Sequence, residues 1–533
     1  MATELETLAA WATAVRAEDV PARVFELARL QIRSVLASVY AGAGTEVGRA
    51  CRDAALALGT SGAATVLPTG ERASAFAAVL ATAPAAMAHD FDDYLFLGHT
   101  GHSAVLAGLA VAEETGATLR DLLVAQVVAN EIAGRLGAYV VVGPQNGQTW
   151  AHIHAAAAVV CAARLRGMSA AQAADALAIA FYQPHYTLFA GFMGSEAKAL
   201  TAAQPMAAGL YAASLAARGV GGARDLLEHP RGFAAAFSFV PLPRLLRGLG
   251  QQWVSDSLSF KIYPGCAYID GPVDAALAAR GQRAIEPSEV QSVDIEATAL
   301  TSAMEAICEE SAPATSLEPI AVTFSARRSV AIALLAGELT PRQLEPAWLA
   351  DNAGAILAIA ERTRVEMTVG RTSAMLRGIG AAVPMMDLVR DLGLRKIWRT
   401  RHRLRSSYVA AAQRGGNRRR PVQLTAAGWL ELLAPIARAA ISGRGQRDFR
   451  QLEFRFGARV RITLRGGEVL EAEVETPRGA AGRSTAETRA LVIAKLAAEA
   501  AAAGAPERAG AIGSLLDGPD DVPATALARA VVG

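Results

Sequence analysis

Apolar residues spaced at the helical period fill the first 240 residues, and this pattern limits what the chain can fold into. Val24, Ala28, Ile32 and Leu36 recur every four positions and so fall on one face of a helix. Alanine is abundant, which lets helices pack closely. The sequence therefore predicts a large, almost purely helical domain. Similar patterns cover residues 50–58, 73–87, 103–114, 119–136, 155–166, 170–181 and 203–218.

The pattern changes after about residue 255, where apolar and polar residues begin to alternate as in half-buried strands. The last two alternating segments flank Arg465-Gly466-Gly467, which indicates a hairpin. Helical patterns lie between the strands and return at about residue 486. The alternating segments are residues 290–298, 364–369, 459–464 and 469–474. The predicted class is α+β, with a large all-α helical domain (1–257 and 480–533) and a smaller α+β lid domain (258–479).

Length and composition agree with a globular protein of two domains. A chain of 533 residues is too long for one ordinary core, and 52% hydrophobic with 19% charged residues argues against disorder. Four widely spaced cysteines without a Cys-x-x-Cys pair favour a reducing, cytoplasmic setting. The N-terminus is acidic, and the longest apolar run, residues 73–88, contains Pro84 and is too short to span a bilayer. We expect a soluble protein with no membrane partner.

A basic insertion occupies about residues 370–450. Within it, residues 395–420 hold ten Arg or Lys and no acid, with Trp398 and Tyr408 among them. Such a run can bind nucleic acid or a phosphate-bearing ligand. A solvated helix followed by a loop explains it equally simply and is the favoured interpretation. Nucleic acid is therefore not an expected partner.

The stretch from His89 to His102 gathers three carboxylates and three imidazoles within an otherwise apolar region. Groups that exchange protons near neutral pH point to a proton-transfer or ligand site, although a helix-capping acidic turn is the alternative. Asp90 and Asp93 are three residues apart, so they would share a face with Asp92 turned away. Asp90 is the expected base. Asp93 is expected to cap backbone amides of the following loop.

A metal site is the rival interpretation, because His152-Ile153-His154 adds a second histidine pair. This segment runs directly into a predicted helix, where positions two apart point to nearly opposite sides. The sequence therefore predicts no metal ligand, and nothing in it resembles a phosphate-binding loop. We expect no metal, nucleotide or other cofactor.

Lysine is rare in this chain, which has 48 arginines and only four lysines. A lysine kept against that bias can mark a place that needs an amine able to lose its proton. Lys198 follows a loop with glycine at both ends. Lys261 begins a rigid turn near the change from the helical to the alternating sequence pattern. Both are candidates for binding an anion.

Four motifs, in this order, resemble signatures of the MmgE/PrpD family. His89-Asp90-Phe91-Asp92-Asp93 is similar to the family's H-x-[DFY]-D-D, and the run from His99 to Glu113 is similar to its HPG…ALALAE segment. Residues 194–209, which include Lys198-Ala199-Leu200, resemble GTxTKPLHAG, and Lys261-x-Tyr263-Pro264-x-Cys266 resembles KxYPCC. The resemblance covers nearly the whole chain except about 370–450.

This resemblance implies a helical domain with an α+β lid, an active site in the cleft between them, a homodimer and no cofactor. It implies removal of a proton next to a carboxylate or imine, followed by elimination, decarboxylation or reprotonation. By position, it gives catalytic or substrate-binding roles to Asp90, His99 and Lys198, with Lys261 nearby. An Asp/His pair suits acid–base work, and an amine suits a carboxylate.

Three positions differ from the family pattern. Gln148 stands where the family has the His of GWHxT, so His152 or His154 is the candidate replacement. Asp270 stands where the family has a His after Tyr-Thr, and Arg328 takes the place of the Tyr of FSLPY. These changes favour a substrate different from those of the parent reactions.

The sequence thus predicts a cofactor-independent lyase or isomerase that acts on a carboxylated small molecule, in specialised metabolism. Two alternatives stay open: a binding or scaffold protein on an altered enzyme fold, and a metal-dependent hydrolase. The predicted catalytic residues are Asp90, His99 and Lys198. The predicted substrate-binding residues are His102, Gln148, His152, Lys261, Asp270 and Arg328.

Overall fold

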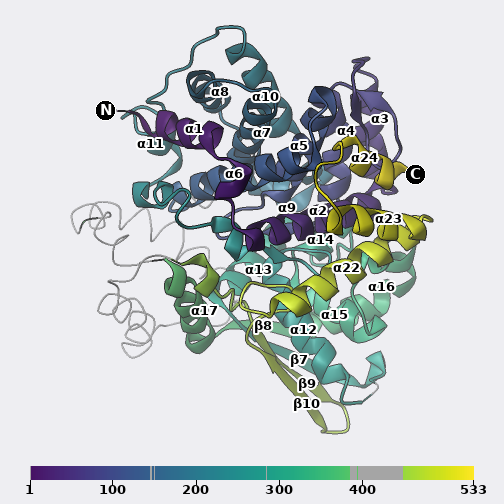
Figure 1. Ribbon diagram of the computed structural model, residues 1–533. Coiled ribbons are helices and arrows are strands. Elements are labelled where there is room, and N and C mark those ends of the chain that lie inside the picture. Colours follow the sequence, from purple (N-terminus) through teal and green to yellow (C-terminus); the bar gives the residue numbers. More distant parts are fainter. Residues whose placement is uncertain (1, 144–146, 149, 284, 384–392, 394–447) are drawn as a thin grey trace.

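The computed structural model describes residues 2–143, 147–148, 150–283, 285–383, 393 and 448–533 (Figure 1). Helices make up most of the first 216 residues, and their ends agree with the sequence-based prediction to within about one turn. They are α1 (Glu4–Ala14), α2 (Ala22–Ala43), α3 (Glu46–Leu56), α4 (Ala75–Met87), α5 (Gly101–Thr115), α6 (Leu119–Tyr139), α7 (Ala151–Leu165), α8 (Ala170–Tyr182), α9 (Phe189–Gly194) and α10 (Leu200–Ala216). A short helix, α11 (Phe233–Phe237), follows.

Local sequence signals set several helix ends. Thr118 begins α6 with a reciprocal pair: its hydroxyl accepts from the Asp121 N–H at 3.1 Å, and the Asp121 carboxylate accepts from the Thr118 N–H at 3.0 Å. The same capping box begins α1 at Thr3 and α8 at Ser169. Gly116 ends α5 in the left-handed conformation, with φ of +70°.

Small residues bring the buried helices close together, as the alanine content predicts. At Gly209 on α10, an added Cβ would lie 2.4 Å from the carbonyl oxygen of Ala155 on α7. Only glycine allows this approach of the two backbones. Helices α5, α6 and α7 are buried along almost their whole length and form the centre of the helical part.

A four-stranded sheet, ordered β10-β9-β7-β8, builds the α+β part. Its strands are β7 (Val290–Ala297), β8 (Thr363–Met367), β9 (Ala458–Leu464) and β10 (Val469–Val474). β7 and β8 are parallel, with Val293 beside Thr363, whereas β9 and β10 form the predicted antiparallel hairpin. Gly467 turns that hairpin with φ of +85°. Figure 1 shows the hairpin extending away from the helical part.

The helices of this part pack on the sheet and on one another around a second hydrophobic cluster. They are α12 (Ala267–Arg280), α13 (Ala299–Ser311), α14 (Pro319–Thr323), α15 (Ala326–Ala336), α16 (Pro346–Glu361) and α17 (Val369–Ala382). The chain then returns to the helical part through α22 (Thr485–Ala502), α23 (Pro506–Asp517) and α24 (Thr525–Val532). α22 packs along α2, as Figure 1 shows.

Short strand pairs connect distant segments. β3 (Asp93–Tyr94) pairs with β6 (Ser259–Phe260) and so joins the histidine–aspartate stretch to the start of the α+β part. The other pairs are β1 (Ala64–Thr65) with β2 (Arg72–Ala73), and β4 (Gly147–Gln148) with β5 (Thr187–Leu188).

The α+β class predicted from the sequence is confirmed, with a large helical part and smaller sheets. The separate hydrophobic clusters of the two parts support the division near residues 257 and 480, which we keep as a proposal. The basic segment 395–420 lies outside the described residues. In the part of the chain that is described, no helix has both the length and the apolar character needed to cross a membrane.

Candidate active site

The histidine–aspartate stretch forms a buried loop between α4 and α5. The exposed fractions of Asp90, Asp92 and Asp93 are 5%, 0% and 0%. Asp90 has φ of +51°, in the left-handed region that Asp adopts more readily than most residues. Carboxylates withdrawn from water in this way need opposite charges or hydrogen-bond donors.

Two lysines supply the positive charge. Lys198, in the short helix η2 (Glu196–Ala199), places Nζ 2.9 Å from Oδ1 of Asp90 and donates to the carbonyl of Met87 at 3.2 Å. Lys261, directly after β6, places Nζ 3.1 Å from Oδ1 of Asp90 and 2.8 Å from Oδ1 of Asp92. The two predicted amines therefore meet on the same buried carboxylate, although they lie 63 positions apart in the sequence.

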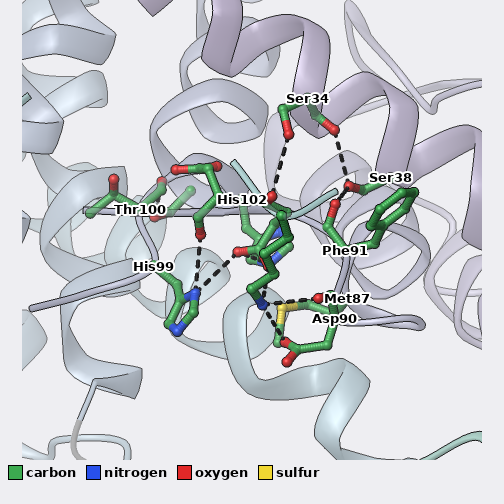
Figure 2. Close-up of polar contacts among 12 residues, drawn as sticks. Ser34, Ser38, Met87, Asp90, Phe91, His99, Thr100 and His102 are labelled. Atoms are coloured by element: carbon green, nitrogen blue, oxygen red, sulfur yellow. Dashed lines mark hydrogen bonds and ion pairs between the residues drawn. The ribbon is translucent and has the colours of Figure 1, made fainter. Parts of the chain in front are cut away.

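Two histidines share the other oxygen of Asp92. Nε2 of His102 lies 3.0 Å from Oδ2 of Asp92, and Nδ1 of His99 lies 3.4 Å from the same atom. Nδ1 of His99 is also 3.1 Å from the carbonyl oxygen of Asp93 (Figure 2). A carbonyl only accepts, so Nδ1 carries the hydrogen and the lone pair of neutral His99 is on Nε2. The His99 side chain is 15% exposed, more than the other members of this cluster.

Charge pairing controls the ionisation of this cluster. Burial alone would raise the pKa of Asp90, but the ammonium groups of Lys198 and Lys261 outweigh it and hold this pKa below its ordinary value. Burial is likewise outweighed at Asp92, where Lys261 and His102 hold the pKa well below the usual range. At Lys261, the two carboxylates overcome burial and raise the pKa. Asp90 and Asp92 are therefore carboxylates at neutral pH, and Lys261 is an ammonium.

Asp93 has a different environment. Its Oδ2 accepts from the Nε2 amide of Gln31 at 2.7 Å, within a buried network that also includes Asn130 and Gln126. Burial and the neighbouring Asp92 raise the pKa of Asp93 to about 6. The expectation that Asp93 caps backbone amides of the loop is wrong, because its donor is a side chain of α2.

Asp270, in the first turn of α12, is 1% exposed, and neither of its carboxyl oxygens has a hydrogen-bond partner among the described residues. Burial, reinforced by the charge of Asp274, raises the pKa of Asp270 well above its ordinary value. The charges of Lys261 and Asp90 also shift the pKa of Asp270, so Asp270 lies within electrostatic reach of the cluster that these two residues form. This shift favours the protonated, neutral carboxyl, which can donate a hydrogen bond.

Cys266 lies beside the same carboxylate as the lysines. Burial and the charge of Asp90 raise the pKa of its thiol above the ordinary value. A protonated thiol is a weak nucleophile, so the raised pKa argues against Cys266 as a nucleophile. Phe324 also reaches the cluster, since Nζ of Lys198 lies 5.5 Å from the centre of its ring. Phe324 and Cys266 bring the α+β part into the site.

The helical placement of the second histidine pair is confirmed. His152 and His154 lie on α7 and face different neighbours: the His152 ring packs 4.9 Å from that of Phe233, while Nδ1 of His154 is 3.1 Å from the Ser103 hydroxyl. The ring of His154 lies 6.2 Å from that of His102 and so borders the Asp92 cluster. In the described ranges, no three His, Cys, Asp or Glu side chains are grouped to hold a metal ion.

Among the described residues, the side-chain hydrogen bonds of Arg328 lie outside the lysine cluster, with Cys308 and nearby backbone carbonyls. Arg328 is 4% exposed and donates to the carbonyls of Pro313, at 2.9 Å, and Ala314, at 3.3 Å, so it ties down the segment before α14. Gln148 lies in β4, paired with Thr187, and its side chain is outside the described part of the structure.

Two residues of the site, Asp92 and Lys495, differ from what the sequence predicted. Asp92 was expected to turn away, yet it is the carboxylate that joins Lys261 to both histidines. The left-handed backbone at Asp90 breaks the helix-like spacing on which that expectation rested. Lys495, on α22, contacts the same loop from the far end of the chain. The rarity of lysine is the signal that could have found it.

Two family models match this chain. The MmgE/PrpD N-terminal domain matches residues 6–244, and the MmgE/PrpD C-terminal domain matches residues 263–372. Two proteins named cis-aconitate decarboxylase, from Aspergillus terreus and from Aspergillus terreus strain NIH 2624, are each 25% identical over 283 residues. The alignment covers 50% of this chain and 58% of theirs, so the chain spans little more than half the length of these relatives.

Proposed function

The chain belongs to the MmgE/PrpD family, and on that basis we propose that it is a lyase or isomerase acting on a carboxylated small molecule. The protein would remove a proton from the carbon next to a carboxylate in elimination or epimerisation, and would add one after loss of CO2 in decarboxylation. The observation that carries this proposal is the buried cluster in which Lys198 and Lys261 share the carboxylate of Asp90, with His99 at its exposed edge. Such a cluster holds both an anion-binding element and proton-accepting groups.

Lys198 is the proposed contact for the substrate carboxylate. Its ammonium has three N–H donors, and among the described residues it has two acceptors, Asp90 and Met87. A substrate carboxylate would accept from the third donor and compete with Asp90 for the ammonium. Lys261 reinforces the positive charge at this point, which would stabilise the negative charge that develops on the substrate carboxylate when the proton leaves.

His99 and Asp90 are the proposed proton-transfer pair. His99 presents a lone pair on Nε2, while Asp92 and the Asp93 carbonyl fix its ring through Nδ1. A carboxylate behind the ring also stabilises the imidazolium that forms when Nε2 takes a proton. Asp90 is a carboxylate whose basicity is suppressed by two ammonium groups. The basicity of Asp90 would rise once a substrate carboxylate replaces it as the ion-pair partner of Lys198.

The protein groups then determine how the reaction ends. The electron pair left on carbon is held by the adjacent carboxylate as an enediolate. Loss of a hydroxyl group from the neighbouring carbon, protonated as it leaves, gives elimination, and return of a proton to the opposite face gives epimerisation. Decarboxylation instead begins with loss of CO2, after which the carbon takes its proton from the same groups. Asp270, a neutral carboxyl, is the proposed donor of a hydrogen bond or a proton to the substrate.

His102, His152 and Gln148 complete the proposed substrate pocket, and Arg328 keeps the proposed role of a second carboxylate contact. We also propose a homodimer, which sedimentation of the full chain tests. No cofactor is required by this scheme, because every group that moves a proton belongs to the chain.

The test is a screen of di- and tricarboxylates, including cis-aconitate because of the name of the two relatives. The full-length protein is incubated with each compound after dialysis against a chelator, and release of CO2, loss of water or inversion is followed by NMR. Turnover of at least one compound, absent in His99→Gln, is the expected result. Binding without turnover would favour a scaffold protein, and activity that needs an added divalent ion would favour a metal-dependent hydrolase; either result contradicts the proposal.

A further inference from the structure

Lys495 lies on the C-terminal helix α22, beyond both ranges that the family models match. It is only 6% exposed. A lysine costs free energy to bury, and this chain uses arginine for nearly all of its other positive charges. The contacts of Lys495 must therefore offset the cost of burying its ammonium group.

The Lys495 ammonium has three N–H groups and three oxygen acceptors. It donates to the carbonyl of Phe91, to the carbonyl of Lys261 at 3.1 Å and to the hydroxyl of Ser34 at 3.0 Å. Its Nζ also lies 3.8 Å from the centre of the Phe91 ring. None of these acceptors is a carboxylate: two are backbone carbonyls of the site and one is a hydroxyl of α2.

The two carbonyl acceptors belong to the two segments that meet in the candidate active site, and Ser34 lies on the neighbouring helix α2. The hydroxyl of Ser34 donates to the carbonyl of Asp92 at 3.3 Å, and the hydroxyl of Ser38 donates to the carbonyl of Phe91 (Figure 2). The N–H of Lys261 also donates to the carbonyl of Asp92, at 3.1 Å. Lys495 thus ties the backbone that carries Asp92 to the backbone that carries Lys261.

We propose that Lys495 is a positioning residue, which holds the Phe91–Asp92 and Lys261 backbones so that Lys261 stays on the carboxylates of Asp90 and Asp92. This inference rests on the proposed function only in treating that cluster as the active site. A carboxylate and an amine on separate segments keep a distance of 2.8 Å only if both backbones are fixed. Lys495 contacts both backbones, in addition to their direct hydrogen bond from the Lys261 N–H to the Asp92 carbonyl.

The ionisation of Lys495 agrees with this role. Burial lowers its pKa to about 7, against the opposing effect of nearby carboxylates. The folded chain therefore holds this proton less tightly than the unfolded chain, and Lys495 becomes a neutral amine as the pH rises through 7. A neutral amine has two donors, so one of its three acceptors is lost. The titratable groups that face Lys495 are Asp92, Asp93, Lys261, Asp270 and Glu499.

The test uses the fact that the chain has only four lysines. Full-length protein labelled with ¹³C and ¹⁵N in lysine gives at most four side-chain NMR signals, which Lys198→Arg, Lys261→Arg and Lys495→Arg assign. The Lys495 signal is expected to titrate near pH 7. In Lys495→Met, the Lys261 signal should shift, because its backbone anchor is gone.

The matched control is Val492→Ala, which truncates a fully buried apolar side chain on the same helix and changes no polar group. It should lower the melting temperature and leave the Lys261 signal in place. If Lys495→Met does not fold, Ser34→Ala removes one acceptor and its link to Asp92, and a smaller shift of Lys261 is expected. An unmoved Lys261 signal in the folded variant, or an equal shift in Val492→Ala, would overturn the proposal.

The NMR readout needs no substrate, so it separates this inference from the proposed function. Should the Lys261 signal shift while no carboxylate is turned over, the proposed function fails and the positioning role stands. Where a substrate is found, Lys495→Met should lower kcat by about 100-fold with a smaller change in KM, as expected for misplaced groups. Full kcat in that variant would overturn the positioning role alone.

Discussion

Nζ of Lys198 lies 2.9 Å from Oδ1 of Asp90, and both side chains are almost completely buried. The amine proposed for the substrate is therefore paired with the proposed base. A substrate carboxylate that displaces Asp90 from the Lys198 ammonium would leave Asp90 paired with Lys261 alone. Because the two ammonium groups hold the pKa of Asp90 low, this exchange would raise its basicity. Substrate binding to Lys198 is thus coupled to the basicity of Asp90 through the ion pair between these two residues.

Replacing Lys198 with Met is expected to lower kcat/KM by about 100-fold, because a charge-assisted hydrogen bond contributes roughly 1.5–3 kcal/mol. Most of the loss should lie in KM, since Lys198 contacts the substrate before and during the reaction. Lys198→Arg keeps the charge and should recover part of the affinity. Steady-state kinetics of both variants check this. An unchanged KM in Lys198→Met would rule out this residue as the carboxylate contact.

Replacing Asp90 with Asn should abolish turnover and also destabilise the fold. A substitution that breaks no core contact usually changes stability by no more than about 1 kcal/mol. The structure changes this expectation, because the variant leaves two buried ammonium groups facing a neutral amide. A loss of about 3 kcal/mol is expected from urea unfolding. Asn tolerates the left-handed backbone at this position, so strain does not add to the loss. Turnover at the wild-type rate would exclude Asp90 as a catalytic group.

Most of the fold could be predicted from periodicity, because its helices and strands bury one face against a core. The apolar period located α2, α5 and α6, and alternation located β7 and the β9–β10 hairpin. The site could be predicted only in part. Lys198, Lys261 and Asp90 were found from residue type, rarity and motif, and the structure brings them together. Their pairing was not predictable, since it depends on contacts between distant segments.

The positions of Asp92 and Lys495 in the site could not be predicted from the sequence. The geometry of Asp92 depends on the positive φ of Asp90, which no local sequence rule required. Lys495 reaches the loop only because α22 packs along α2, a contact between segments more than 400 residues apart. Neither fact has a periodic signature in the sequence.

Asp93→Asn tests the raised pKa of Asp93. Below about pH 4 the carboxyl is protonated in both the folded and unfolded chains. Between pH 4 and 6 the folded chain binds the proton more tightly, so the free energy of unfolding of the wild type falls as pH rises. The variant lacks this titration. It should therefore gain stability relative to the wild type, by up to roughly 3 kcal/mol at pH 7, since one pKa unit corresponds to about 1.4 kcal/mol.

Urea unfolding at pH 4, 5, 6 and 7 measures this difference for the two proteins. The sequence-based expectation was the reverse, a stability cost from losing a cap. A difference that stays constant from pH 4 to pH 7 would show that Asp93 keeps an ordinary pKa in the folded chain. Gln31→Ala is a useful companion, because it removes the donor to Asp93 without changing its charge.

Deletion of residues 395–420 should leave the helical part folded, because this segment lies outside both matched ranges. The expected result is a cooperative melting curve and unchanged helical circular dichroism. Replacement by a neutral linker of the same length is the control for chain connectivity. Aggregation of both variants would mean that the segment belongs to the core.

The most direct test of the central claim is solvent exchange at the carbon next to a carboxylate. The full-length protein is incubated in D2O with the carboxylate that it binds most tightly, and deuterium entering the ligand is followed by proton NMR. The wild type should exchange this position, Asp93→Asn should exchange it as well, and His99→Gln and Asp90→Asn should lower the rate by at least about 100-fold. Exchange at the same rate in His99→Gln and Asp90→Asn, or none in the wild type with a bound ligand, would contradict the account.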